Sequence, residues 1–197
     1  MTTIAILGTG NMGQGLAKRL KGKSNLVIGS RTPDAGELSY ADAVAQADVV
    51  VLALPFDAAL AEAKALNLAG KTVVDMSNPV TADFSGLKLG HTTSAAEEIQ
   101  KAAPGAKVVK AFNTIFASLF DAPANELKQV PVFVAGNDEA AVNTVADLAR
   151  NAGFAVETAG ALDGARLLEP VGMLNIRFGY GLGRGTAIAP AWVKLAA

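Results

Sequence analysis

The residues whose types and spacing point most directly to chemistry are the glycines of Gly8-Thr9-Gly10-Asn11-Met12-Gly13. They follow the apolar run at residues 4–7, and a helical pattern opens at Met12. Strand, glycine turn and helix in this order are typical of a dinucleotide-binding βα unit. The first glycine turns the chain, the second lets a pyrophosphate approach the backbone, and the third lets the helix pack against the strand. Unpaired N–H groups at the helix start then bind the phosphates, and the alternative is a glycine-rich turn that binds nothing.

The end of the next expected strand, residues 25–29, indicates which dinucleotide binds. An NAD site carries Asp or Glu about twenty residues after the glycine loop, where it binds the ribose 2′-hydroxyl. This chain has Ser30, Arg31 and Thr32 there. A guanidinium and two hydroxyls suit a 2′-phosphate, which a carboxylate would repel. The pattern favours NADP over NAD, and the alternative is that Arg31 is a solvated loop charge.

The rest of the chain alternates strand and helix patterns, which must position these residues. The continuous apolar run at residues 48–54 is typical of a strand buried on both faces, as in a parallel sheet. The alternation predicts an α/β fold: a Rossmann-type, doubly wound, mostly parallel sheet with C-terminal helices. We expect a single NADP-binding domain over residues 1–197, with a helical extension from about residue 163 that is interrupted at Pro170. A short helix is expected around residues 40–46, and the connection after Arg31 is expected to be too short for a full helix and another strand. Ser94, with Glu97 three residues later, is expected to cap a further helix.

In such sheets, ligands bind beyond the carboxyl ends of the strands. Four stretches that follow expected strands should therefore line one edge, at residues 8–12, 53–56, 77–79 and 112–117. Asn113 and Thr114 are the best polar candidates there to hold a nicotinamide carboxamide or the edge of a flavin-like ring, and Asn78 lies in the same set of strand ends.

This predicted edge is poor in acids and bases. The single histidine, His91, lies in a loop, where a solvated side chain is favoured over a proton donor. Asp75 ends a strand and Asp83 sits in a turn, which weighs against an acid/base pair. Lys110 is expected to be an edge charge of its strand rather than a phosphate contact. We predict no catalytic side chain and no metal ligand.

A site of this kind suits hydride transfer between two ring cofactors. The reactive atoms belong to the two rings themselves, and the protein orients the rings and excludes water. Reduction of a ketone or imine usually needs a positioned general acid, so an imine or carbonyl reductase is an alternative. A nonenzymatic NADP sensor or binding module is another, because trimmed loops and missing catalytic groups suit it equally.

Composition narrows the class of protein. The chain has 197 residues, a net charge of −1 and no cysteine. No basic stripe indicates nucleic-acid binding, and neither a disulfide framework nor a thiolate metal site can form. The first strand begins too early for a signal peptide, and no apolar run approaches the roughly twenty residues that span a bilayer. We expect a soluble, cytoplasmic protein without a membrane partner.

Motifs spread over nearly the whole chain resemble a known family, the NADPH-dependent reductases of the deazaflavin coenzyme F420 and their wider group of dinucleotide-binding oxidoreductases. The matching pieces, in the family's order, lie at residues 4–13, 29–31, 50–55, 108–114 and 166–178. The cytosolic domain of the six-transmembrane metalloreductases is similar through residues 110–114. At Asn113 and Phe116, the deazaflavin reductases carry histidine and proline instead.

The resemblance implies roles for individual residues and for the assembly. Thr9, Ser30 and Arg31 would bind the 2′-phosphate. It further implies a pyrophosphate site at Gly8, Gly10, Asn11 and Met12, a nicotinamide-ribose site at Ala53, Leu54 and Pro55, and a border of the nicotinamide and second ring at Asn113, Thr114, Ile115 and Ala117. A flavin-type or deazaflavin-type small molecule would accept the hydride from NADPH, and the C-terminal helices would close a homodimer.

Overall fold

The computed structural model describes residues 2–193 and residue 195. Met1, Lys194, Ala196 and Ala197, which belong to the predicted domain 1–197, lie outside the described residues. The strands are β1 (Thr3–Leu7), β2 (Asn25–Ser30), β3 (Leu38–Ser39), β4 (Val49–Leu52), β5 (Thr72–Asp75), β6 (Lys107–Lys110), β7 (Pro131–Gly136) and β8 (Ala155–Thr158). The helices are α1 (Asn11–Leu20), α2 (Tyr40–Gln46), α3 (Phe56–Ala65), α4 (Ala95–Ala102), α5 (Ala124–Leu127), α6 (Glu139–Ala152) and α7 (Ala165–Ile176). Shorter turns are η1 (Ala117–Asp121), η2 (Leu162–Gly164) and the π-helical η3 (Arg177–Gly181).

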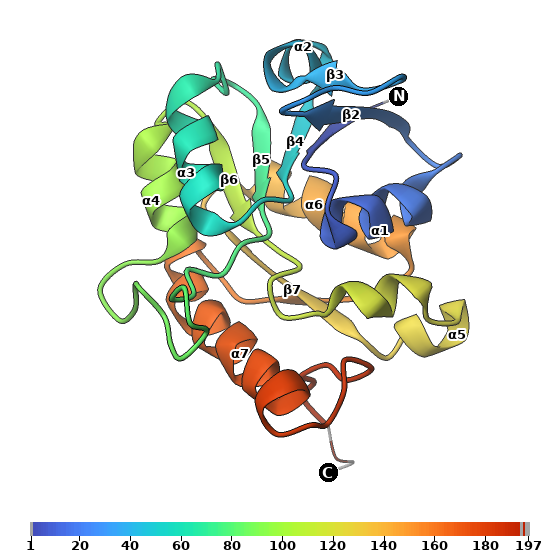
Figure 1. Ribbon diagram of the computed structural model, residues 1–197, viewed down its shortest axis with the longest axis vertical. Coiled ribbons are helices and arrows are strands. Elements are labelled where there is room, and N and C mark those ends of the chain that lie inside the picture. Colours follow the sequence, from blue (N-terminus) through green and yellow to red (C-terminus); the bar gives the residue numbers. More distant parts are fainter. Residues whose placement is uncertain (1, 194, 196–197) are drawn as a thin grey trace.

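The strands form one eight-stranded sheet in the order β3-β2-β1-β4-β5-β6-β7-β8 (Figure 1). All neighbours from β3 to β6 pair in parallel, whereas β7 runs antiparallel to β6 and parallel to β8. The predicted Rossmann-type, mostly parallel sheet is therefore confirmed. Because β1, β4, β5 and β6 point the same way, the segments that leave them meet at one edge of the sheet.

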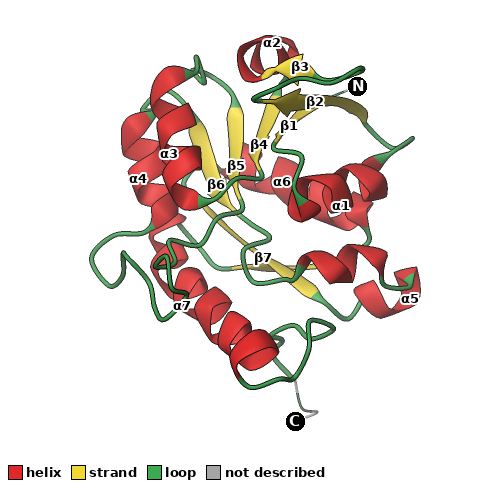
Figure 2. Cartoon of the chain, in the orientation of Figure 1, coloured by secondary structure: helices red, strands yellow, loops and turns green. Residues whose placement is uncertain are grey.

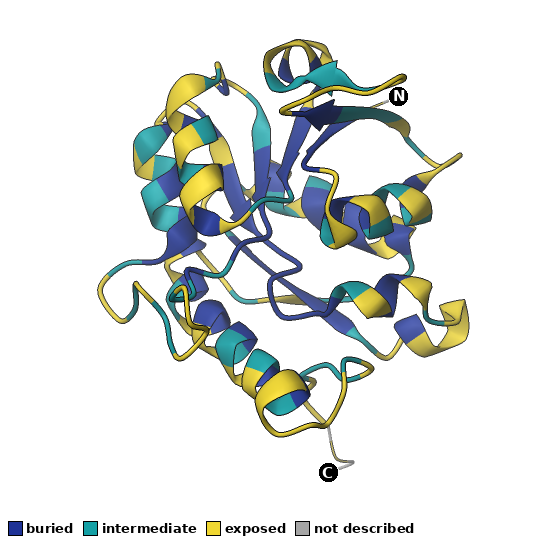
Figure 3. Cartoon of the chain, viewed as in Figure 1, coloured by how far each residue is buried: buried dark blue, intermediate teal, exposed yellow. Residues whose placement is uncertain are grey.

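Helices cover both faces of the sheet (Figure 2). Successive residues of a strand point to opposite faces, and β1 shows this alternation. Ile4 and Ile6 pack with α1 and α6 on one face, while Ala5 and Leu7 pack with α2, α3 and α4 on the other. The strands are therefore buried from both sides, and Figure 3 shows exposed residues mainly on the outer surfaces of the helices.

Side-chain caps fix where three of the helices begin. Ser39 starts α2, Ser94 starts α4 at the predicted position, and Asp138 starts α6, each accepting a hydrogen bond from a backbone N–H in the first turn. Helix α1 differs, because it begins after Gly10, which offers no side chain to its first turn. The free N–H groups of that turn remain available to a ligand.

Two details of the predicted fold are wrong. The short helix expected around residues 40–46 is present as α2, but the connection after Arg31 also has room for a strand, because β3 needs only two residues. Helix α7 also continues through Pro170 instead of breaking there. Proline removes a single backbone donor, and the buried residues Leu168, Glu169 and Gly172 hold the helix against the rest of the protein.

Candidate cofactor and acceptor site

The glycine turn has the geometry that a dinucleotide requires. Gly8 has a φ of 114°, and a Cβ there would lie 2.5 Å from the carbonyl oxygen of Ala53. A Cβ on Gly13 would lie 2.1 Å from the carbonyl oxygen of Gly8, so these two glycines are required by the fold itself. A Cβ on Gly10 would meet nothing within 4 Å. Gly10 therefore faces open space over the uncapped start of α1, where a pyrophosphate fits.

The residues predicted to select NADP lie together at the end of β2. Ser30 is buried, and its hydroxyl donates to the carbonyl oxygen of Thr32, 3.1 Å away. Arg31 and Thr32 are exposed. Tyr40, at the start of α2, is close enough to Arg31 for the guanidinium to affect its phenol: burial and Glu62 raise the pKa of Tyr40, and Arg31 opposes them. Tyr40 was not among the predicted residues, because nothing in its local pattern links it to the end of β2.

A cavity of about 600 Å³ lies at the carboxyl ends of the parallel strands. It brings together eleven of the residues predicted individually for the site, namely Gly10, Asn11, Met12, Ala53, Leu54, Pro55, Asn78, Asn113, Thr114, Ile115 and Ala117. Gly8, Thr9, Ser30, Arg31 and Thr32 do not line it, since they belong to the turn beneath and to the end of β2. A dinucleotide that runs from the end of β2 across α1 and ends in the cavity would contact both groups of residues.

Further walls of the cavity come from residues that were not predicted individually for the site. The segment after β5 contributes Met76 and Phe84, and the C-terminal region contributes Asn175, Ile176 and Tyr180. Helix α7 reaches the edge of the sheet from a distant part of the chain (Figure 1). Its sequence shows only an apolar helix, which gives no sign of the surface it covers.

Amide side chains fasten the strand ends to α7. Asn113 Nδ2 donates to Asn78 Oδ1 and to the carbonyl oxygen of Leu168, both at 2.9 Å. Asn78 Nδ2 donates in return to the carbonyl oxygen of Asn113 at 2.7 Å. A Cβ on Gly172 would lie 2.7 Å from Asn78 Oδ1, so only glycine lets α7 come this close. The interlocked amides fix the position of both side chains before any ligand binds.

Some polar groups at this edge lack partners within the protein. Ser77 Oγ, Asn113 Oδ1 and Thr114 Oγ1 are buried and make no hydrogen bond. Buried polar atoms without partners are uncommon in folded proteins, so each of these three atoms calls for a partner such as a water molecule or a ligand. Nearby, Phe112 has a φ of 63°, a left-handed conformation that costs a residue with a side chain about 1–2 kcal/mol. Such strain clusters at functional sites.

The prediction that Lys110 is an edge charge is wrong. Lys110 ends β6 opposite Asp75, and its side chain is fully buried. Its Nζ lies 2.8 Å from Asp75 Oδ2, 2.8 Å from Glu169 Oε1 and 2.5 Å from the carbonyl oxygen of Ser77. Glu169 also accepts a hydrogen bond from the backbone N–H of Ala95 at the start of α4. The cluster thus joins two strand ends, α4 and α7, and the two carboxylates, Asp75 and Glu169, together compensate for burial of the lysine.

Protonation in the cluster follows from burial and charge together. Burial alone would lower the pKa of Lys110, but Asp75 and Glu169 outweigh it, so that the pKa is raised and the ammonium is retained. Burial raises the pKa of Glu169, and Lys110 and the Ala95 N–H oppose this only in part. Because Lys110 is enclosed by protein, it orients the Ser77 carbonyl and does not react with a substrate.

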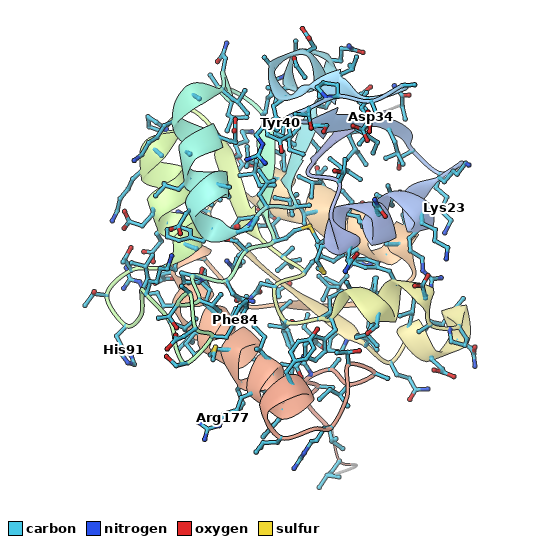
Figure 4. All side chains as sticks on the ribbon, viewed as in Figure 1. Lys23, Asp34, Tyr40, Phe84, His91 and Arg177 are labelled. Atoms are coloured by element: carbon cyan, nitrogen blue, oxygen red, sulfur yellow. The ribbon has the colours of Figure 1, made fainter. Side chains whose placement is uncertain are left out.

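The other ionisable candidates, His91 and Asp83, do not line the cavity. His91 is exposed and points outward from its loop (Figure 4), as expected for a solvated histidine. Asp83 accepts hydrogen bonds from Thr81 and Ser85, which lower its pKa to about 2. It is therefore the acceptor of its turn rather than half of an acid/base pair. Among residues 2–193 and 195 there is no group of three or more potential metal-ligating side chains, and no helix is long and apolar enough to cross a membrane.

The sheet order, the glycine turn and the cavity place the chain in the class of dinucleotide-binding Rossmann proteins. Residues 3–79 match the family described as NADP oxidoreductase, coenzyme F420-dependent. The chain is 32% identical to the F420-dependent NADP reductase of Methanocaldococcus jannaschii over 202 residues, which cover 88% of this chain and 90% of that protein. The protein therefore belongs to the coenzyme F420-dependent NADP oxidoreductase family, and the expectation of an NADP-dependent oxidoreductase is confirmed.

Two further similarities bear on the site. A crystal structure from Arthrobacter sp. FB24, described as an F420-dependent NADP reductase, superposes with a TM-score of 0.81 at 34% identity, covering 94% of this chain and 97% of that one. The metalloreductase STEAP3 of Rattus norvegicus is 32% identical over 180 residues, 85% of this chain but only 36% of that protein. The chain thus covers 90% or more of these two reductases and about a third of the metalloreductase.

Proposed function

We propose that the protein transfers a hydride between NADPH and a planar ring acceptor of the flavin or deazaflavin type. The observation that carries this proposal is the lining of the cavity at the carboxyl ends of the strands. Among the described residues that border it, Tyr180 alone has an ionisable side chain, and Tyr180 lies at its exposed rim. Ketone or imine reduction needs a positioned acid, whereas hydride transfer between two rings needs orientation and exclusion of water.

The residues present suit NADP. The open space at Gly10 and the uncapped start of α1 would receive the pyrophosphate, together with Gly8, Asn11 and Met12. The proposed 2′-phosphate site is formed by Thr9, Ser30, Arg31 and Thr32. Bound there, the cofactor supplies the hydride, and the protein holds its ring at the edge of the sheet. Ala53, Leu54 and Pro55 would flank the nicotinamide ribose.

The two rings would meet beside Asn78, Asn113, Thr114 and Ala117. The side-chain Nδ2 of Asn113 donates to two protein acceptors, so only the side-chain oxygen Oδ1 is left for a ligand. That oxygen needs an N–H donor, which a nicotinamide carboxamide or the pyrimidine edge of a flavin provides. The names of the relatives, F420-dependent NADP reductases, support a deazaflavin as the acceptor.

We further propose that the helical extension belongs to the same domain and forms a homodimer. Helix α7 supplies a wall of the cavity, which ties the extension to the nucleotide site. Its outer side exposes Leu167 and Leu174, followed by Tyr180 and Leu182. Exposed apolar side chains gathered along one helix and its continuation are typical of a surface that another subunit covers.

The test is oxidation of NADPH under anaerobic conditions with FMN, riboflavin and a deazaflavin as separate acceptors. Loss of NADPH matched by reduction of an equal amount of acceptor is expected with at least one of them. Tight NADPH binding without turnover of any acceptor would instead indicate an NADP sensor and would overturn the proposal.

A further inference from the structure

Both backbone polar groups of Ser77 are held by the buried charge cluster of Asp75, Lys110 and Glu169. The Ser77 N–H donates to Asp75 Oδ1 at 2.9 Å, and the Ser77 carbonyl oxygen accepts from Lys110 Nζ at 2.5 Å. The peptide groups on either side of Ser77 therefore cannot turn without breaking a hydrogen bond to a buried charge. Such bonds are about twice as strong as those between neutral groups.

Glu169 ties this cluster to the helices. Its carboxylate lies 2.8 Å from Lys110 Nζ and accepts from the backbone N–H groups of Ala95 and Ala96, at 3.0 and 3.4 Å, where α4 begins. The side chains of Asp75 and Lys110 are 0% exposed, and that of Glu169 is 2% exposed. Residues of β5, β6, α4 and α7 thus meet around one lysine, and together they fix the backbone at the end of β5.

The side chain of Ser77 is left free by this arrangement. Ser77 is 5% exposed and lines the cavity of about 600 Å³, yet its Oγ makes no hydrogen bond within the protein. A buried hydroxyl without a partner is costly, because it has given up its hydrogen bonds to water. The fold therefore spends two charged groups on the backbone of Ser77 and leaves the hydroxyl to whatever enters the cavity.

Thr114 shows the same arrangement, built from different parts. Its carbonyl oxygen accepts from Asn175 Nδ2 on α7 at 3.1 Å, and its hydroxyl is buried, unpartnered and part of the cavity wall. The backbone of Thr114 thus depends on Asn175, whereas that of Ser77 depends on the charge cluster. This difference allows the two hydroxyls to be compared in one experiment.

The chemistry of the expected ligands limits what the Ser77 hydroxyl can meet. The nicotinamide carries a carbonyl oxygen in its carboxamide, and a flavin or deazaflavin carries carbonyl oxygens on its pyrimidine edge. A carbonyl oxygen accepts hydrogen bonds and cannot donate, so it requires a donor from the protein. Asn113 Nδ2 already donates to two protein acceptors, whereas the Ser77 hydroxyl has its proton free.

We propose that Ser77 donates a hydrogen bond from its hydroxyl to a carbonyl oxygen of a bound ring, and that the charge cluster positions Ser77 for this contact. The carbonyl belongs either to the nicotinamide carboxamide or to the hydride acceptor. The inference rests on the proposed function, in that it takes both rings to meet in this cavity. Ser77 touches the ligand, and Asp75, Lys110 and Glu169 act through it.

The first test compares stability with affinity in Ser77→Ala. Because the hydroxyl has no protein partner, its removal should leave the urea midpoint of the unliganded protein unchanged or raise it. Calorimetry then measures binding of NADP⁺ to the unliganded protein and of riboflavin to the NADP⁺-saturated protein, so that no turnover is required. One of the two ligands should bind about fivefold more weakly, the effect of one net hydrogen bond, and identifies the carbonyl. The other should bind as before.

Ser94→Ala is the matched control. Ser94 is also a buried serine, but its hydroxyl is used within the protein as the cap of α4, and it does not line the cavity. Its removal should lower the urea midpoint and leave both affinities unchanged. The two serines should thus respond in opposite ways.

The second test asks whether the charge cluster acts through Ser77. Lys110→Met combined with Glu169→Gln removes the donor to the Ser77 carbonyl and should weaken the same ligand by about fivefold. Adding Ser77→Ala should then cause no further loss, whereas adding Thr114→Val should change affinity by the same factor as in the wild-type protein. Glu169→Gln alone, which keeps the lysine, should show the same pattern at a smaller size and replaces the double variant if that one does not fold.

Several results would overturn the inference. Unchanged affinity for both ligands in Ser77→Ala would assign the hydroxyl to a water molecule. Equal losses for both ligands, or a lower urea midpoint, would indicate a general disturbance of the cavity. Independent losses for Ser77→Ala and the cluster variants would refute the positioning role. If riboflavin does not bind at all, NADP⁺ alone decides: weaker binding in Ser77→Ala supports the role of Ser77 and counts against a flavin acceptor, and unchanged binding refutes that role.

Discussion

Replacing Lys110 by methionine tests the buried charge cluster that joins the strand ends to α7. The change keeps much of the side-chain volume but removes the cation between Asp75 and Glu169, all of which are essentially inaccessible to solvent. Removing one partner of a buried ion pair costs about 3–5 kcal/mol, because the remaining charge is left uncompensated. The carbonyl oxygen of Ser77 loses its donor as well, so we expect a loss at the upper end of that range.

The assay is urea unfolding followed by circular dichroism, in which the midpoint should fall while the slope stays constant. The loss should be smaller at about pH 5 than at about pH 8, because Glu169 can take up a proton once the ammonium is gone. Adding Glu169→Gln to Lys110→Met should restore about 1 kcal/mol or more by removing one of the two carboxylates. Lys107→Met, on the same strand in a half-exposed pair with Asp138, is the control and should cost less than about 1 kcal/mol. Equal losses in Lys110→Met and Lys107→Met would refute the reasoning.

Further expectations concern the cofactor, the packing, the pH and the assembly. Arg31→Asp should shift preference from NADP toward NAD, and unchanged NADP affinity in a titration would contradict the role given to Arg31. Gly172→Ala places a Cβ 2.7 Å from Asn78 Oδ1 and should lower the free energy of unfolding by about 1–3 kcal/mol, whereas a neutral effect in urea would show that α7 can shift. The raised pKa of Glu169 means that the folded protein binds this proton more tightly than the unfolded chain. The protonated Glu169 side chain contributes its full stabilisation below its ordinary pKa of 4.5, and this contribution is lost as the pH rises through the pKa of the folded state. Glu169→Gln should therefore abolish this fall in the free energy of unfolding with rising pH. Leu167→Glu, at a side chain that is 73% exposed, should convert a dimer to a monomer in light scattering, and an unchanged mass would argue against this interface.

Local sequence patterns are sufficient to predict part of the fold and part of the site. The glycine turn, Ser30 with Arg31, and the strand ends at Asn78 and Asn113 follow from short-range rules about where parallel strands end. The cap at Ser94 was predictable for the same reason, since a helix start depends on neighbouring residues. These residues needed no knowledge of distant segments.

Long-range packing determines the features that the sequence did not predict. Lys110 resembles an exposed strand charge until Glu169 reaches it from α7, and no spacing in the sequence joins the two residues. The same helix brings Gly172 and Asn175 to the cavity, and it continues through Pro170 because burial outweighs one missing hydrogen bond. Helix propensity and turn rules act within a few residues, so they cannot report such contacts.

The central claim, that a hydride passes directly from NADPH to a ring held at this edge of the sheet, is tested most directly with NADPH deuterated at the transferred position. After anaerobic incubation with the purified protein and a flavin or deazaflavin acceptor, the products are examined for the fate of the label. The account predicts equal amounts of oxidised NADP and reduced acceptor. It also predicts slower turnover with the deuterated NADPH wherever hydride transfer is the rate-limiting step. Binding of NADPH without any oxidation across these acceptors would contradict it.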